Sequence, residues 1–196
     1  MPMSAKRAPA TFDDLVRLRD DGRAVELVAG EIVEKAAPTP AHGRAELRFG
    51  EALGGYNRRT GGPHGPGGWW LMTEVEVLYE KSHEVFRHDV LGFRRDRHAA
   101  CPSETPVRAC PDWVCEILSP STARYDIVQK QRTLHGHGVA HYWILDPEHA
   151  TLTVLRHSEP AYLRILDAGA GERVRAEPFD AVEISVSALL GRDDDD

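Results

Sequence analysis

The sequence predicts an α/β protein in which helices flank a mixed β-sheet. The first observation is the order of the periodic segments, which runs helix, hairpin, helix, several strands, helix and several strands. The second is the segment 112–118, DWVCEIL, which is apolar at nearly every position. Such a run predicts a central strand that is covered on both faces. The third is size, because 196 residues are most economically one domain.

The chain divides by composition into three parts. We expect residues 1–10 to be a disordered N-terminal segment, 11–191 to be a single domain and 192–196 to be an acidic tail. The apolar run at 69–72 is far shorter than the roughly 18 residues that span a bilayer. The first ten residues lack the apolar core of a signal peptide. We therefore expect a cytoplasmic protein without a membrane partner.

The charge balance limits how the protein binds a polyanion. The net charge is −7, and without the four terminal aspartates the rest of the chain carries −3. A mildly acidic body excludes a protein that holds nucleic acid by bulk charge alone, but not an enzyme that makes local contacts. The three cysteines include no CxxC pair, which favours reduced thiols over a disulfide framework.

The N-terminal elements follow from capping and turn residues. Thr11, with Asp14 three residues later, predicts a capping box at the start of a short helix that ends near Gly22. The segment 24–35 then predicts two strands around a tight Ala-Gly turn. A second helix is expected over 42–53, after two prolines that close the hairpin.

Strands dominate the rest of the chain. The Gly-rich run 58–68 predicts a flexible connection, and it lacks the GK[ST] ending of a phosphate-binding loop. A long hairpin follows over 69–93, then a loop, then the central strand 112–118. The run 119–122 predicts the start of a helix that extends to about Leu134. Three further strands and a final strand with a short apolar turn complete the pattern (141–147, 151–157, 161–169 and 179–190).

The central strand carries a carboxylate in an apolar row. Strict alternation puts Glu116 on the same face as Val114 and Leu118. A buried carboxylate costs several kcal/mol unless it is paired or binds a metal. The alternatives for Glu116 are therefore a metal site and a structural salt bridge to an arginine.

A second acid precedes it in the chain. Alternation along the preceding strand places Asp89 on one face with Val85 and Leu91. Two carboxylates on neighbouring strands can converge on one cation, and the backbone carbonyl of Ile117 adds a third oxygen. An all-oxygen set suits Mg²⁺ or Mn²⁺. The pairing of Asp89 with Glu116 therefore predicts a divalent-metal site.

Lys130 lies on the helix that leaves this strand. A lysine ammonium beside a metal-bound water can orient the nucleophile and stabilise charge on a phosphate. The alternative is an ordinary helix-surface ion pair, because Asp126 lies four residues before Lys130.

The segment 111–147, PDWVCEILSPSTARYDIVQKQRTLHGHGVAHYWILDP, resembles the signature segment of the Uma2 family. The resemblance extends over about 12–190 and includes the upstream ELVAGEIV and the helix-opening His42. It implies a restriction-endonuclease-like core of the PD-(D/E)xK nuclease superfamily. The implied activity is divalent-metal-dependent hydrolysis of DNA phosphodiester bonds.

The resemblance also implies roles for residues. Asp89 and Glu116 would hold Mg²⁺ or Mn²⁺, and Lys130 would position the attacking water. Glu31 and His42 would line the same cleft. The chain departs from the superfamily motif at Leu118, where a lysine is expected two residues after the second acid, and at His88, where a proline usually precedes the first.

Two alternatives to the endonuclease remain open at this point. One is a catalytically inactive interaction or scaffold protein on the same fold, which Leu118 and the acidic body favour. The other is a phosphodiesterase for small molecules or nucleotides, which would share the metal site. The sequence also leaves open assembly as a homodimer.

Overall fold

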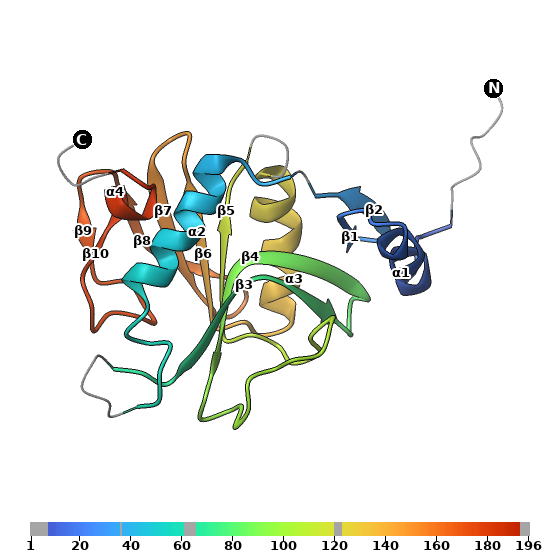
Figure 1. Ribbon diagram of the computed structural model, residues 1–196, viewed down its shortest axis with the longest axis horizontal. Helices are drawn as coiled ribbons and strands as arrows, with labels where there is room; N and C mark the ends of the chain where they lie inside the picture. The colour runs from blue at the N-terminus through green and yellow to red at the C-terminus, as the bar shows by residue number, and fades with distance from the viewer. Residues whose placement is uncertain (1–7, 36, 61–65, 120–122, 193–196) are drawn as a thin grey trace.

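The computed structural model describes residues 8–35, 37–60, 66–119 and 123–192. Within these residues an eight-stranded sheet has the order β2-β1-β4-β5-β6-β7-β8, and β3 pairs with β4 beside this path (Figure 1). The sheet is mixed, because β5 and β6 are parallel and the other pairs are antiparallel. Its strands are β1 (Val25–Val28), β2 (Glu31–Glu34), β3 (Trp69–Tyr79), β4 (Glu84–Arg94), β5 (Trp113–Ile117), β6 (His141–Asp146), β7 (Thr151–Arg156) and β8 (Leu163–Gly169).

Helices cover both faces of this sheet. One face packs against α2 and α4 around the aromatic residues Trp113, Trp143 and Phe179. The other face packs against η1 and α3, where Leu134 contacts the core. The predicted α/β class with a helix-flanked mixed sheet is confirmed. The remaining elements are α1 (Phe12–Asp20), α2 (Pro40–Ala52), the π-helix η1 (Tyr125–Lys130), α3 (Gln131–Gly136), α4 (Val186–Leu189) and the small pair β9 (Arg173–Val174) and β10 (Ile184–Ser185).

Most of the predicted elements form where the sequence places them. The capping box of Thr11 and Asp14 begins α1, and the following hairpin is β1 and β2. The second helix begins two residues earlier than predicted, because Thr39 is its N-cap and Pro40 its first residue. The central strand is β5, buried at every position between β4 and β6.

The helix after β5 differs from the prediction in form. It contains six residues of π-helix, η1, before the α-helical turns of α3. Residues 120–122, predicted to start this helix, lie outside the described residues, as do 1–7 of the predicted disordered segment and most of the acidic tail. At the described end of that first segment, the Ala10 N–H donates to the Gly30 carbonyl at 2.7 Å. No helix in the described part of the chain is long and apolar enough to cross a membrane.

The sheet forks along one edge of β4. Near the start of β4, Val85 pairs with Leu27 of β1, and near its end Val90 pairs with Cys115 of β5. Between these two points, side chains bind the backbone of Arg87. Its N–H donates to the Glu26 carboxylate at 2.7 Å, and its carbonyl accepts from the Lys35 ammonium at 2.9 Å. The fork therefore brings polar side chains into the middle of the sheet.

The prediction that Asp89 shares one face with Val85 and Leu91 is wrong. Val85 packs under α1, whereas Leu91 packs in the same cluster as Phe86 on the η1 face. Strict alternation would place Phe86 and Leu91 on opposite faces. Across the hairpin, Glu74 has a left-handed φ of +53° and lies between Thr73 and Val75, which pair with Val90 and His88. At this point along β4 the alternation of side chains between the two faces of the sheet is interrupted, and Asp89 lies at the interruption.

Candidate active site

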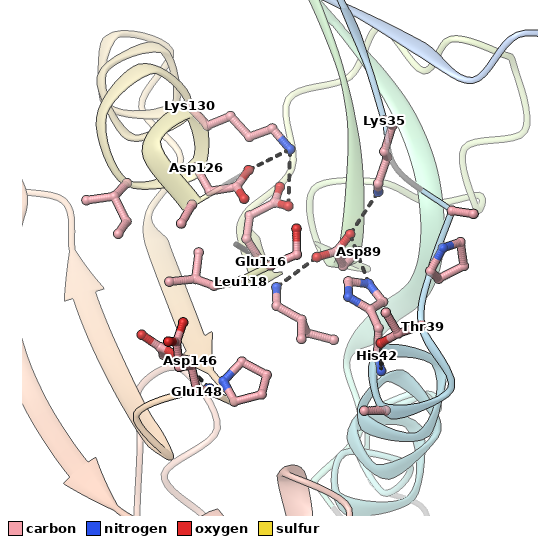
Figure 2. Close-up of a pocket in the computed structure, with 18 of the residues that line it drawn as sticks. Lys35, Thr39, His42, Asp89, Glu116, Leu118, Asp126, Lys130, Asp146 and Glu148 are labelled. Atoms are coloured by element: carbon pink, nitrogen blue, oxygen red, sulfur yellow. Dashed lines mark hydrogen bonds and ion pairs between the residues drawn. The ribbon is translucent and has the colours of Figure 1, made fainter. Parts of the chain in front are cut away.

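A cavity of about 510 Å³ opens at the fork of the sheet. Its walls come from β1, β4, β5, α2, η1 and the turn after β6. Asp89, Glu116 and Lys130 all line it, as do Ile117 and His42. Figure 2 shows the two carboxylates between Lys130 on one side and Lys35 and His42 on the other. The structure thus brings the three residues predicted as a triad into one cavity.

Asp89 is enclosed by hydrogen-bond donors. Its Oδ1 lies 2.8 Å from Lys35 Nζ and 3.4 Å from His42 Nε2, and its Oδ2 accepts from the Ile117 N–H at 2.8 Å. The side chain is only 3% exposed. Burial alone raises the pKa of Asp89, but the His42 contact and the charges of Lys35 and Lys130 outweigh it and hold the pKa well below its ordinary value. Asp89 is therefore an anion at neutral pH.

Glu116 has a different environment. Its Oε1 contacts His88 Nδ1, and its Oε2 lies 3.2 Å from Lys130 Nζ. His88 is fully buried, its Nε2 is 2.7 Å from the Tyr79 hydroxyl, and burial and the charge of Lys130 lower its pKa well below the usual value. Burial raises the pKa of Glu116 well above its usual value; Lys130 opposes this shift and Asp89 adds to it. In the absence of a cation, Glu116 readily keeps a proton.

Lys130 lies among three buried carboxylates. Its Nζ is 3.2 Å from Glu26 and Glu116 and 3.1 Å from Asp126. The predicted i, i+4 ion pair of Asp126 with Lys130 forms, but both side chains are only 3% exposed, so the pair is buried and does not lie on the helix surface. Burial alone lowers the pKa of Lys130, but these carboxylates raise it well above its ordinary value. The ammonium is therefore charged and neutralises part of a buried acidic cluster.

Lys130 faces inward from the π-helix η1. Asp126 and Lys130 are the buried residues of η1, whereas Ile127 and Val128 are 44% and 45% exposed. The Tyr142 hydroxyl of β6 donates to the Asp126 carbonyl at 2.9 Å and ties the helix to the sheet. Short π-helical segments are frequent at functional sites.

The two other residues predicted at the cleft are placed differently. His42 lines the cavity near the N-terminus of α2. Glu31 is exposed at the hairpin turn, opposite Val28, and is not among the residues that line the cavity. Glu26, on the partner strand β1, takes the inward position instead. Leu118, at the position expected for the motif lysine, forms part of the cavity wall.

Sequence reasoning missed three residues around Asp89. Lys35 follows the end of β2, Glu46 lies one helical turn after His42 on α2, and Glu74 lies opposite Asp89 on β3. Burial and the neighbouring Glu74 raise the pKa of Glu46 to about 7. The spacing of His42 and Glu46 is the one sequence signal that predicts their proximity.

The cavity is suited to a cation. Six carboxyl groups and two lysines line its described walls, so it carries a net charge of −4 when every carboxyl group is ionised and the histidines are neutral. Carboxylate and carbonyl oxygens are the ligands that Mg²⁺ and Mn²⁺ prefer. The donor set and the excess of negative charge both fit a divalent ion between Asp89 and Glu116.

Comparisons with known proteins agree with this fold. A family model described as "Putative restriction endonuclease", Uma2, matches residues 10–187. Among solved structures, a "putative nuclease belonging to DUF820" from Anabaena variabilis is similar with a TM-score of 0.67 and 19% identity. That match covers 93% of this chain and 98% of the other, and it confirms the restriction-endonuclease-like fold. No curated protein matches the chain.

The range matched by the family model includes the strands of the sheet and the residues that line the cavity. Its matched range includes the segment 111–147 that carried the resemblance, and it begins before α1 and ends within α4. The chain belongs to the Uma2 family.

Proposed function

We propose that this protein is a metal-dependent endonuclease that hydrolyses DNA phosphodiester bonds. Asp89 and Glu116 would hold Mg²⁺ or Mn²⁺, and the carbonyl of Ile117 would add a third oxygen. The observation that carries the proposal is the entry of two buried carboxylates, from neighbouring strands, into one cavity of net negative charge. The descriptions of the family and of the structural neighbour, which name nucleases, support a nucleic-acid substrate.

Each residue of the site has a task in this proposal. A bound divalent ion lowers the pKa of a coordinated water and neutralises charge on the phosphate. Lys130, held 3.2 Å from Glu116 and positively charged, would position the water for in-line attack. The N–H of Ile117 fixes one Asp89 oxygen, and the His88–Tyr79 pair fixes one Glu116 oxygen. The carboxylates are therefore pre-oriented.

The pKa of Glu116 sets the direction of the pH dependence. Because burial raises that pKa well above its usual value, cation binding must displace a proton from Glu116. Metal affinity, and with it cleavage, therefore rises with pH until Glu116 is ionised in the free protein.

The test is nicking of supercoiled plasmid DNA by the purified protein with Mg²⁺ or Mn²⁺. Glu116→Ala and Lys130→Ala should each abolish nicking. Glu148→Ala is the matched control, because Glu148 is an exposed carboxylate that lines the same cavity. Cleavage that continues at the wild-type rate in either site variant would reject the assignment. Glu116→Gln, which keeps the size of the side chain, and a thermal melt of each variant separate loss of chemistry from loss of fold.

Leu118 favours a second candidate, a non-catalytic interaction protein on the nuclease fold. Leucine stands where the motif lysine is expected, and Lys130 is already surrounded by three carboxylates. Calorimetric titration with Mn²⁺ discriminates the two, because only a competent site gives heat that depends on Glu116. A substrate panel of plasmid and short phosphodiesters then separates an endonuclease from a small-molecule phosphodiesterase.

A further inference from the structure

We propose that the cavity receives an unpaired nucleotide, so that single-stranded DNA is the substrate of this site and intact duplex DNA is not. This inference rests on the proposed function, because it names the substrate class of the same site. The feature that points to it is an apolar wall beside Asp89 and Glu116. The side chains of this wall are Leu118 directly after β5, Ile127 of η1 and Pro147 in the turn after β6.

The apolar wall is open to a ligand. Ile127 is 44% exposed, and Leu118 and Pro147 are only partly buried. Val128, the next residue of η1, is 45% exposed but is not among the residues that line the cavity. Apolar side chains that remain exposed in a pocket with a few polar groups are typical of ligand sites. A bound molecule with an apolar face would cover this wall.

The size of the cavity indicates which part of a nucleic acid fills it. Its volume of about 510 Å³ lies in the range of pockets that enclose a small molecule, roughly 300–1,000 Å³. A phosphate group fills little of that space and offers nothing apolar to the wall. A nucleobase offers a flat apolar face, and enzymes that act on an extruded nucleotide hold its base between aromatic or apolar side chains. In a duplex, stacked neighbours cover both faces of each base.

Burial of the two carboxylates requires the nucleotide to enter the cavity. The side chains of Asp89 and Glu116 are 3% and 1% exposed, so a phosphate reaches an ion between them from inside the cavity. An unpaired nucleotide can turn its phosphate to this ion and its base to the apolar wall. In a duplex, pairing and stacking hold the base in place and oppose this arrangement.

The charge of the cavity also disfavours a duplex. Duplex DNA carries one negative charge per roughly 1.7 Å of its axis, and proteins hold it through several lysine and arginine contacts to phosphates. Among the described residues that line the cavity, the cations of this type are Lys35 and Lys130, and carboxylates contact both. The cavity therefore suits one phosphate with its ion better than the dense charge of two strands.

Leu118 has a role in this arrangement. It stands where the motif lysine is expected, and a lysine there would place a further charge beside Glu116. Leucine instead gives the base an apolar surface close to the scissile phosphate. The departure from the motif is thus a substrate contact, and Lys130 supplies the ammonium from the neighbouring helix.

The test compares cleavage of an end-labelled oligonucleotide with cleavage of the same strand annealed to its complement, using the full chain and Mn²⁺. The single strand should be cut about tenfold faster or more, because its bases are free to stack on the protein. Equal rates, or a faster duplex, overturn the inference. A dinucleotide that is hydrolysed as fast as the oligonucleotide also overturns it and identifies a small phosphodiester as the substrate. Supercoiled plasmid should still be nicked, because negative supercoiling opens base pairs.

Fluorescence anisotropy with Ca²⁺ in place of Mn²⁺ separates this inference from the endonuclease. Ca²⁺ also takes oxygen ligands, and the measurement reports binding without reference to cleavage. Tighter binding of the single strand by a protein that cuts no DNA supports the nucleotide site and rejects the proposed activity. Equal binding of single strand and duplex by an active protein overturns the nucleotide site and leaves the activity standing.

Ile127→Asn tests the apolar wall, and Val128→Asn is the matched control. The two side chains are exposed to nearly the same extent, and neither change alters the net charge. Ile127→Asn should weaken binding of the single strand about tenfold, because it removes an apolar contact to the base, and should leave duplex binding unchanged. Val128→Asn should bind like wild type. Equal affinities of the two variants for the single strand overturn the role of the wall, and thermal melts confirm that both variants fold.

Discussion

Replacing Lys130 by methionine removes the one ammonium among Glu26, Glu116 and Asp126 while keeping much of the side-chain volume. All three carboxyl groups lie within 3.2 Å of Lys130 Nζ, and every one of these side chains is at most 7% exposed. Solvent therefore cannot take over the role of the lost charge. The variant must bury uncompensated negative charge, bind protons or open the fold.

The expected cost follows from burial. Removing one partner of a buried ion pair typically costs about 3–5 kcal/mol, because the remaining charge is left desolvated. At pH 8 we expect Lys130→Met to lose this amount of unfolding free energy. At lower pH the carboxyl groups of the folded variant bind extra protons that the unfolded chain does not. The deficit should then shrink by up to about 1.4 kcal/mol per pH unit for each such proton.

Urea denaturation at pH 8 and pH 5.5, followed by fluorescence of the buried tryptophans, measures both effects. Lys81→Met is the matched control, because Lys81 is exposed in the turn between β3 and β4. Such a surface change usually stays within about 0.5 kcal/mol. If Lys130→Met costs no more than Lys81→Met, Lys130 does not neutralise the buried acids. A double variant with Asp126→Asn should recover part of the loss, since it removes one uncompensated charge.

Two further predictions concern stability. Because Lys35 and His42 help to hold the pKa of Asp89 below its usual value, Asp89 stabilises the fold above the ordinary aspartate pKa of about 3.9, and this contribution fades as pH falls through the lower folded pKa. In Asp89→Asn the free energy of unfolding should therefore fall less between pH 5 and pH 3 than in wild type. Parallel pH profiles of wild type and variant would contradict this role. Gly92→Ala should lower the free energy of unfolding by about 1–3 kcal/mol, because the added methyl group overpacks the core. Its Cβ would lie 2.9 Å from Leu71 Cδ2 and 3.0 Å from Trp69 Cε3, and an unchanged urea midpoint would show that these side chains yield freely.

The acidic pair was predictable because its signal is local. Glu116 interrupts an apolar strand, and a carboxylate in such a row requires a partner whatever the tertiary structure. Asp89 was predictable as that partner because it lies on the strand that directly precedes the Glu116 strand in the chain. The same reasoning applies to Glu26, which stands in a strand buried at all four positions and faces the cavity. Glu31, predicted in its place, lies beyond the turn and faces solvent.

The rest of the site depends on tertiary structure. Lys130 has the spacing of an exposed helix pair, and its burial depends on how η1 packs against the sheet. Lys35 is the first residue after a short edge strand, and nothing local indicates that its ammonium reaches the Arg87 carbonyl. Glu74 meets Asp89 through the register of a long hairpin. Strict alternation also does not predict the left-handed φ at Glu74.

Asp89 and Glu116 are proposed to bind one divalent ion between β4 and β5. Anomalous diffraction from crystals equilibrated with Mn²⁺ tests it most directly. A manganese peak is expected within about 2.0–2.3 Å of a carboxylate oxygen of each residue. The peak should be absent in crystals of Glu116→Gln. A peak elsewhere in the cavity only, or the same peak in Glu116→Gln, would contradict this metal site.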